Sequence, residues 1–231
     1  MISVDRVYQK VLAIANKEQR GYITPQEFNL FADYAQMDIF EQYFYDVEQF
    51  ERRVDNTAEL TKTKIEVFKK GAMISGNQYN NPLPADNYLI ESVWGRKENG
   101  EQVTVEKLDR DGQHNVHAAM TASPLLKPNE TRPVYWVLNN TISFDPILSN
   151  YGVNYIKVPE KPNWTYIVSG GGHALFNPDL NAGWRDFELH PSEENTLVIK
   201  ILQLTGVNIK DYNLTQVAAA SEAKKIQQEK S

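Results

Sequence analysis

Residues Thr24-Pro25-Gln26-Glu27-Phe28 mark the start of the longest helix that this chain predicts. Thr24 suits the N-cap, Pro25 suits the first helical position, and Glu27 can reach back to complete a capping box. The predicted helix extends to about Val54 and carries aromatic residues at positions 28, 31, 34, 40, 43, 44, 45 and 50. These residues do not form one narrow stripe, so we expect the helix to need cover on several faces, from its own domain or from a neighbouring subunit.

Three zones of the sequence together predict an α+β fold. Residues 1–70 are predicted to form an N-terminal helical hairpin, whose first helix has apolar residues at positions 4, 7, 11, 12 and 14 and ends at Gly21. Residues 71–189 are predicted to form an antiparallel β sandwich or barrel-like domain, and residues 190–231 to form C-terminal helices and a tail. We expect the zones to pack as one compact unit, with the tail at 211–231 loosely held or disordered.

Turn signals and alternating apolar residues define the strands of the central zone. Residues 87–94 and 102–108 are predicted strands, and Asn99-Gly100 between them is a strong hairpin signal. Prolines punctuate the zone, as expected between short strands. The other predicted strands are 134–138, 141–144, 153–158, 164–169 and 185–189.

The last zone begins with a helix start signal. Pro191 suits the first turn, and Glu193 and Glu194 follow it where negative charge is favourable. Gly206 is expected to end this helix. Its predicted apolar face consists of Leu197, Val198, Ile201, Leu202 and Leu204.

Composition excludes several classes of protein. The chain has 231 residues, 41% of them hydrophobic, and a net charge of −6, so it can bury a core but lacks the basic footprint of a sequence-specific nucleic-acid binder. It has no cysteine, which excludes disulfides and thiolate zinc sites. No signal peptide and no apolar run of about 18 residues is evident, so we expect assembly in a cytoplasm and no membrane partner.

The segment from Asn16 to Glu27 imitates an EF-hand calcium loop. If Asn16 is position 1, Gly21 falls at position 6 and Glu27 at position 12, as the pattern requires. Calcium also needs oxygen ligands at positions 3 and 5, where this chain has Glu18 and Arg20, and the guanidinium is a cation. The preferred interpretation is therefore a turn at Gly21 followed by a helix cap at Glu27, with no metal.

Two polar loops carry residues typical of binding sites, but their patterns favour ordinary loops. His114 and His117 lie near Asp109 and Asp111, but no third ligand for a metal is identifiable. Residues 169–173, Ser-Gly-Gly-Gly-His, lack the Lys-Ser/Thr ending of a phosphate-binding loop, and no nucleophile elbow is present. We therefore interpret residues 169–173 as a flexible turn between two strands.

Paired carboxylates and tryptophans give two weaker candidates. The pairs Asp109/Asp111 and Glu193/Glu194 could act in acid–base chemistry, but such pairs are usually solvated or paired with a helix dipole. The three tryptophans at positions 94, 136 and 164 could form a platform that stacks on a sugar, although aromatic core residues are the commoner case. No nucleophile–base or metal constellation emerges, so the sequence predicts no catalytic, cofactor or metal residues.

A stiff segment at residues 155–164 is the best candidate for contact with another chain. Pro159 and Pro162 force an extended backbone, with Tyr155 and Trp164 at its ends. The alternative is an ordinary edge strand closed by a proline-rich turn. Together with the aromatic helix, this segment gives the predicted intersubunit residues: Tyr34, Phe40, Tyr43, Tyr45, Tyr155, Pro159, Pro162 and Trp164.

Seven phrases spread over most of the chain resemble virion structural proteins of tailed phages, in particular ring or head-to-tail connector proteins of crAss-like and related phages. They lie at residues 8–12, 16–28, 133–136, 155–164, 187–194, 197–202 and 206–210. The resemblance implies a non-enzymatic bacteriophage virion component with no cofactor. It implies a homo-oligomeric ring, expected to be twelve-fold, that contacts portal and other neck or tail proteins during viral assembly. The net negative charge of the chain would suit the wall of a channel through which DNA passes without binding.

Two other functions stay open from the residues alone. A carbohydrate-binding or receptor-binding tail module would use Trp94, Trp136 or Trp164. An EF-hand-like calcium-responsive module would use residues 16–27. An enzyme ranks below both.

Overall fold

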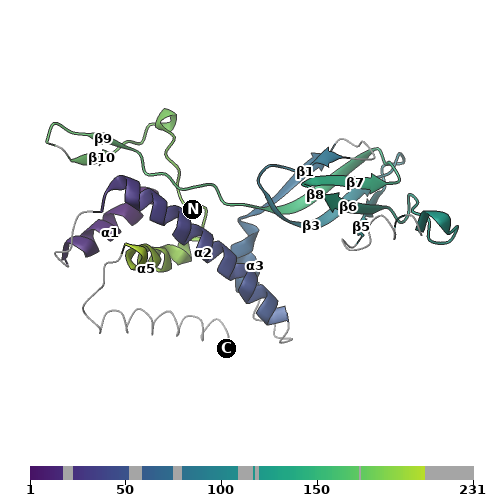
Figure 1. The fold of residues 1–231 in the computed structure, drawn as a ribbon, viewed down its shortest axis with the longest axis horizontal. Coiled ribbons are helices and arrows are strands. Elements are labelled where there is room, and N and C mark those ends of the chain that lie inside the picture. Colours follow the sequence, from purple (N-terminus) through teal and green to yellow (C-terminus); the bar gives the residue numbers. More distant parts are fainter. Residues whose placement is uncertain are drawn as a thin grey trace. The chain divides into compact units, whose positions relative to one another are not determined.

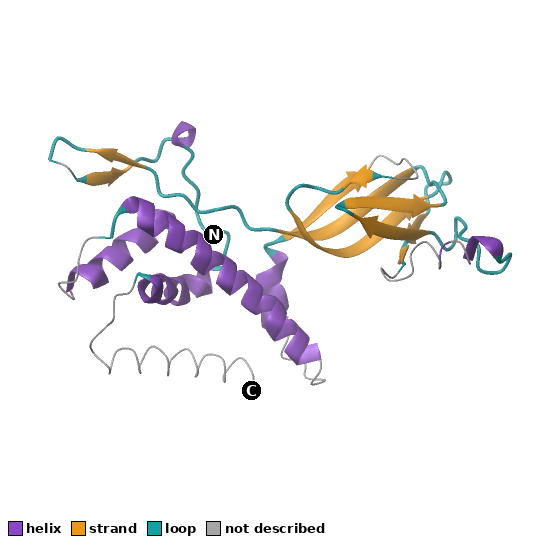
Figure 2. Ribbon diagram, in the orientation of Figure 1, coloured by secondary structure: helices purple, strands orange, loops and turns teal. Residues whose placement is uncertain are grey.

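The computed structural model describes residues 1–17, 23–51, 59–74, 80–108, 117, 120–171 and 173–205. It contains helices and antiparallel sheets, which confirms the predicted α+β class (Figure 2). The chain forms two compact units: Met1–Val67 with Pro159–Ser231, and Phe68–Val158. This division differs from the single unit and the zones that we expected. The central β unit ends at Val158, about thirty residues before the expected boundary, because the chain returns to the helices at Pro159.

The first unit is built on helices (Figure 1). They are α1 (Val4–Lys17), α2 (Pro25–Glu51), α3 (Glu59–Glu66) and α5 (Glu194–Leu204), with a short 3-10 turn, η4 (Pro191–Glu193), before α5. Helix α5 packs against both α1 and α2, and α3 contacts α2. The buried face of α5 is Leu197, Val198, Ile201 and Leu202, as predicted, whereas Leu204 lies partly exposed at its end. Gly21, Gly206 and the tail at 211–231 lie outside the described residues.

The predicted start of α2 is confirmed. The backbone N–H of Glu27 donates to Oγ1 of Thr24 over 3.3 Å, and the backbone N–H of Thr24 donates to Oε2 of Glu27 over 3.0 Å. These reciprocal bonds are a capping box. The hydrogen bond from the Thr24 backbone N–H lowers the pKa of the Glu27 carboxyl most, and the bond from the Thr24 hydroxyl lowers it further. The helix is described as far as Glu51, so the predicted extension to Val54 lies outside the described residues.

The buried face of α2 is narrower than the distribution of aromatic residues around the helix would suggest. Phe28, Ala32, Ala35, Ile39 and Tyr43 are buried at the spacing of one helical face. Alanines form part of this stripe because they allow close approach of the packed elements. The opposite side of the helix carries exposed Leu30, Tyr34 and Tyr45.

The remaining elements of the first unit follow the return at Pro159. Strands β9 (Tyr166–Val168) and β10 (Ala174–Phe176) form a two-stranded antiparallel sheet, and the 3-10 turn η3 (Leu180–Ala182) follows. The strand predicted at 164–169 is thus shorter than expected. Residues 185–189 do not form a strand. They make single bridges, Arg185 with Asn163 and Phe187 with Ile2, because no continuous partner lies alongside them.

The second unit contains two four-stranded sheets. One has the order β1 (Lys69–Ile74), β8 (Asn150–Lys157), β3 (Asn87–Arg96), β4 (Gln102–Thr104). The other has the order β2 (Asn81–Pro82), β7 (Thr141–Asp145), β6 (Val134–Leu138), β5 (Glu106–Lys107). All pairs are antiparallel except β5 with β6. One core takes side chains from both sheets, including Val93, Val153, Ile142 and Phe144, as a sandwich requires.

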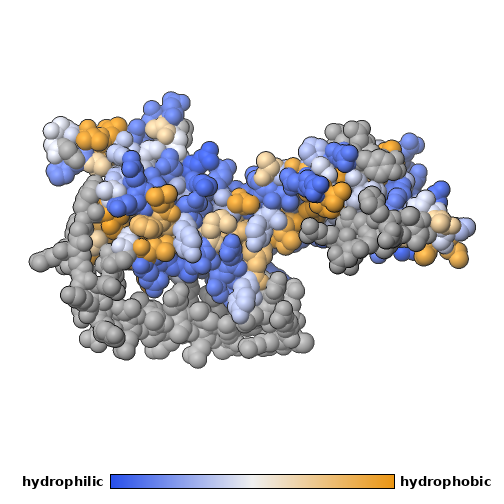
Figure 3. All heavy atoms as spheres, viewed as in Figure 1, coloured by the Kyte–Doolittle hydropathy of each residue, from blue (hydrophilic) through white to orange (hydrophobic). Residues whose placement is uncertain are grey.

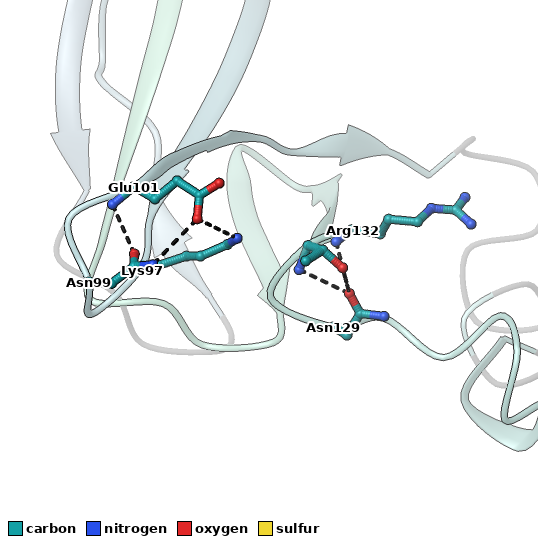
Figure 4. A network of polar contacts seen from close by, with 6 residues as sticks. Lys97, Asn99, Glu101, Asn129 and Arg132 are labelled. Carbon is teal, nitrogen blue, oxygen red and sulfur yellow. Dashed lines mark hydrogen bonds and ion pairs between the residues drawn. The ribbon is translucent and has the colours of Figure 1, made fainter.

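The hairpin predicted at Asn99-Gly100 joins β3 to β4 (Figure 4). Gly100 has φ of 85°, a conformation that favours glycine. The Oδ1 atom of Asn99 accepts from the backbone N–H of Glu101 over 2.9 Å, and Lys97 pairs with Glu101 over 3.0 Å. A second turn in Figure 4 is held by Asn129, whose Oδ1 accepts from the backbone N–H of Arg132 over 3.0 Å.

Candidate interaction surface

Helix α2 clamps the returning segment through two side-chain amides. Asn29 accepts from the backbone N–H of Trp164 over 2.8 Å and donates to the Trp164 carbonyl over 3.2 Å. Gln36, which is fully buried, donates to the Glu160 carbonyl over 2.8 Å and accepts from the backbone N–H of Glu188 over 3.0 Å. Glu188 in turn accepts from the backbone N–H of Glu160 over 2.9 Å. These bonds satisfy backbone groups that would otherwise be buried without partners.

Trp164 anchors the same segment inside the first unit. Only 1% of its surface is exposed, and its ring lies 4.0 Å from the ring of Tyr8, centroid to centroid. Its Nε1–H donates to Oδ1 of Asp5 over 2.9 Å. Tyr166 and Phe176 stack near the same indole, at 5.8 and 6.1 Å. The indole therefore joins α1 to the base of the β9–β10 hairpin.

A groove of about 620 Å³ lies beside this clamp. One wall is the start of α2, with Asn29, Leu30 and Asp33, and the other wall is residues 161–163 with Gly183 and Arg185. Its charged lining residues all lie in ion pairs: Lys161 with Asp33 over 3.2 Å, and Arg185 with Glu160, which lies outside the lining, over 2.9 Å. Two cations and two carboxylates cancel, so the groove has no net charge from these groups. Leu30, 72% exposed, gives it an apolar edge.

One face of the β9–β10 hairpin packs on Trp164 at its base, although Val168 on that face is 65% exposed, and the other face is uncovered. The register pairs Tyr166 with Phe176, Ile167 with Leu175 and Val168 with Ala174, and successive pairs point to opposite sides. The Tyr166–Phe176 pair faces Trp164. The Ile167–Leu175 pair therefore points away from it, and these side chains are 55% and 52% exposed. Figure 3 shows apolar atoms gathered on this hairpin.

The eight predicted intersubunit residues differ in their exposure within the single chain. Six of the eight are buried within this single chain, although Pro162 also lines the groove beside α2: Phe40, Tyr43, Tyr155, Pro159, Pro162 and Trp164. Tyr34 and Tyr45 are exposed on α2. The stiff segment at 155–164 was correctly seen as extended, but it crosses from the second unit to the first and packs on α2, because Asn29 and Gln36 bind its backbone.

The other candidate sites are dispersed or used structurally. Of the EF-hand pattern, residues 18–22 lie outside the described residues, and Glu27 caps α2. His117 pairs with Asp145 over 2.8 Å beside Trp136, whereas His114, Asp109 and Asp111 are not among the described residues. Within the described parts of the chain, no group of three or more His, Asp or Glu side chains could hold a metal.

The remaining loop and acidic pair have clear structural roles. Ser169 and His173 lie between β9 and β10, and the backbone N–H of Ser169 donates to the His173 carbonyl over 2.9 Å. Glu193 lies at the start of α5, as predicted, but it is not solvated. It is buried and pairs with Lys64 of α3 over 2.9 Å, while Glu194 pairs with Lys10 over 2.8 Å. The two carboxylates thus link the start of α5 to α3 and α1.

The tryptophans do not form a common platform. Trp164 belongs to the core of the first unit. Trp94 and Trp136 lie on β3 and β6, which are in different sheets of the second unit. Trp94 lies across from Gly152 of β8 and close to Arg96.

The residues that shape the surface were missed at the level of sequence. Asn29, Gln36 and Asp5 carry no motif, and the apolar hairpin pair was hidden within a longer predicted strand. One signal was available: residues 162–178 are the longest stretch of the chain without Asp, Glu, Lys or Arg, 17 residues in all.

None of the helices in the described ranges combines the length and apolar character that a membrane span requires. No protein-family model matches the chain, and a comparison with curated proteins found no match.

Proposed function

We propose that this chain is a structural subunit of a tailed-phage virion that assembles into a ring at the portal, neck or tail, as a head-to-tail connector protein. One observation carries the proposal: the first unit presents two different apolar surfaces on two elements. The first is the Ile167–Leu175 pair of the hairpin, and the second is Leu30 and Tyr34 on α2.

Two different surfaces are what a ring requires. In a closed ring each subunit meets its two neighbours through heterologous contacts, so it must present one surface forward and another back. Exposed apolar groups on both surfaces would be covered by assembly. The resemblance of seven phrases to connector proteins of tailed phages supports the same function.

The fold also suits a rigid subunit that resists mechanical force. Both stretches that form the first unit are joined by the amide clamps of Asn29 and Gln36 and by the Trp164 anchor. These are contacts between residues far apart in the sequence, so the surfaces of this unit are presented on one packed scaffold.

The test is quantitative mass spectrometry of purified phage particles that encode this chain, scaled to the portal protein. A fixed ratio near one, or a small integer multiple, is expected for a symmetric ring. Hundreds of copies would place the chain on the capsid surface, and its absence from particles would overturn the proposal.

A further inference from the structure

The β9–β10 hairpin is unusually free of charge for this chain. Residues 162–178 contain no Asp, Glu, Lys or Arg, in a protein of net charge −6. Copies of an acidic protein repel one another, so a contact between them is favoured where the surface is neutral. The hairpin provides such a surface.

The hairpin is also incompletely covered. A two-stranded sheet is marginally stable in water by itself and gains from packing on one face. Trp164 packs near the Tyr166–Phe176 pair at the base of one face, whereas Ile167 and Leu175 form an exposed cross-strand pair on the other face. Each of these side chains would gain free energy from burial.

The groove beside α2 has matching properties. Its ion pairs, Lys161–Asp33 and Arg185–Glu160, leave it neutral, so it would not repel an uncharged hairpin. Leu30 forms its apolar edge and Tyr34, four residues further along α2, lies on the same helix face. Its volume of about 620 Å³ is within the range of sites that bury a ligand of several side chains' size.

From these observations we infer that the hairpin of one copy docks into the α2 groove of a neighbouring copy, with Ile167 and Leu175 packing against Leu30 and Tyr34. The inference rests on the proposed function, because it assigns the contact between successive ring subunits. Each copy donates one hairpin and receives another, so the contact is heterologous and repeats around a closed ring.

The absence of cysteine in the chain permits a direct test by crosslinking. Two single variants of the full chain, Leu175→Cys and Leu30→Cys, are purified with tags of different mass, mixed and treated with a short bismaleimide. One cysteine per copy excludes any link within a chain. We expect the 175–30 heterodimer to be the main product. A control mixture of Leu125→Cys with Leu30→Cys uses an exposed leucine of the second unit and should give little product.

Charge variants then test whether the two surfaces meet. Leu175→Lys alone and Leu30→Glu alone should each weaken self-association about tenfold to a hundredfold, since each removes apolar burial at the contact. An equimolar mixture of the two should recover association, because the new ammonium group on one copy then meets the new carboxylate on its neighbour, and the other contact is native. Leu125→Lys should leave association unchanged. Light scattering reports the mass, and circular dichroism confirms that every variant is folded.

Three results would overturn the inference: a dominant 175–175 product, an unchanged association in Leu30→Glu, or a monomeric wild-type chain that gives no 175–30 product at its solubility limit. Failure of the proposed function is separately visible. If the 175–30 link forms but the chain is absent from particles, the contact stands and the virion role does not. If the chain is in particles but the 175–30 link is absent, the virion role stands and the proposed contact does not.

Discussion

Trp164 donates its indole N–H to the carboxylate of Asp5 over 2.9 Å, and the two residues are 159 positions apart in the sequence. Asp5 lies in the first turn of α1, whereas Trp164 follows the whole second unit. The bond therefore joins the two separate stretches that form the first unit. The stability of that unit depends on such long-range contacts more than on its single helices.

Replacement of Trp164 by phenylalanine should destabilise the first unit by about 2–3 kcal/mol, through the lost hydrogen bond and the cavity left beside Tyr8. Urea unfolding followed by far-ultraviolet circular dichroism measures the change. Trp184→Phe is the matched control. Its Nε1–H also donates a hydrogen bond, to the Pro178 carbonyl over 2.9 Å, but the residue is only partly buried, so its loss should be smaller. Equal losses in both variants would contradict the anchoring role of Trp164.

The Lys64–Glu193 pair should be costly to break. Only 12% of the Lys64 side chain and 5% of the Glu193 side chain are exposed, and their charged atoms are 2.9 Å apart. Glu193→Gln removes the negative charge that lies 2.9 Å from the Lys64 ammonium, near the ring of Tyr43, and we expect a loss of about 3 kcal/mol in unfolding free energy. Denaturant titration of the variant measures this loss.

Glu106→Gln is the matched control for this substitution. Glu106 pairs with Arg132 over 3.6 Å on the surface, where both side chains are more than half exposed. Its loss should therefore stay below about 1 kcal/mol. A Glu193→Gln variant as stable as Glu106→Gln would show that the buried pair contributes nothing.

Local signals in the sequence predicted local structure well. The capping box at Thr24 and Glu27 and the Asn99-Gly100 turn act within a few residues, so both were predicted correctly. Strand β6, Val134–Leu138, was predicted at its observed bounds, because its signal also lies within a few residues. Strand β1 was missed because Lys69, Lys70 and Gly71 have poor strand propensity, and its pairing with β8 overrides that preference.

Contacts between residues far apart in the sequence could not be predicted in this way. The return of the chain at Pro159 depends on Asn29 and Gln36, whose amides lie in a helix and carry no local signal. Aromatic side chains also misled the choice of interface residues. Ala32 and Ala35 bury one side of α2, so the sequence alone could not show which aromatic residues lie in the core and which on the surface.

Gly152 should not tolerate a side chain. A Cβ atom at this position would lie 2.2 Å from the ring of Trp94, its neighbour across β3 and β8. Gly152→Ala should therefore lower the unfolding free energy by about 1–3 kcal/mol, through strain in a packed site. Thermal and urea unfolding measure the change.

Gly71→Ala is the control in the adjoining strand. A Cβ atom there would meet only Oδ1 of Asn154, at an ordinary 3.5 Å, so this variant should be neutral or slightly more stable. If Gly152→Ala proved as stable as Gly71→Ala, the close approach of Trp94 to the backbone would not matter for the sheet.

Tyr151 should give the second unit a stability that falls at alkaline pH. Its hydroxyl donates to the Pro146 carbonyl and accepts from the backbone N–H of Leu148, and its ring stacks on Phe144 at 3.7 Å. Burial raises the pKa of this phenol to about 12, and the charge of Asp145 also raises it. In the unfolded chain the pKa of tyrosine is about 10.

Because the folded pKa lies above the unfolded pKa, the contribution of Tyr151 is complete below pH 10 and is lost as the pH rises to about 12. The loss is on the order of 2–3 kcal/mol. Tyr151→Phe cannot ionise, so it should be less stable than the wild type at neutral pH, and this difference should shrink between pH 10 and 12. Tyr88→Phe, at an exposed position of β3, should follow the wild-type curve. Urea unfolding at stepped pH measures all three proteins, and a constant difference between wild type and Tyr151→Phe would show that the buried phenol does not control the alkaline transition.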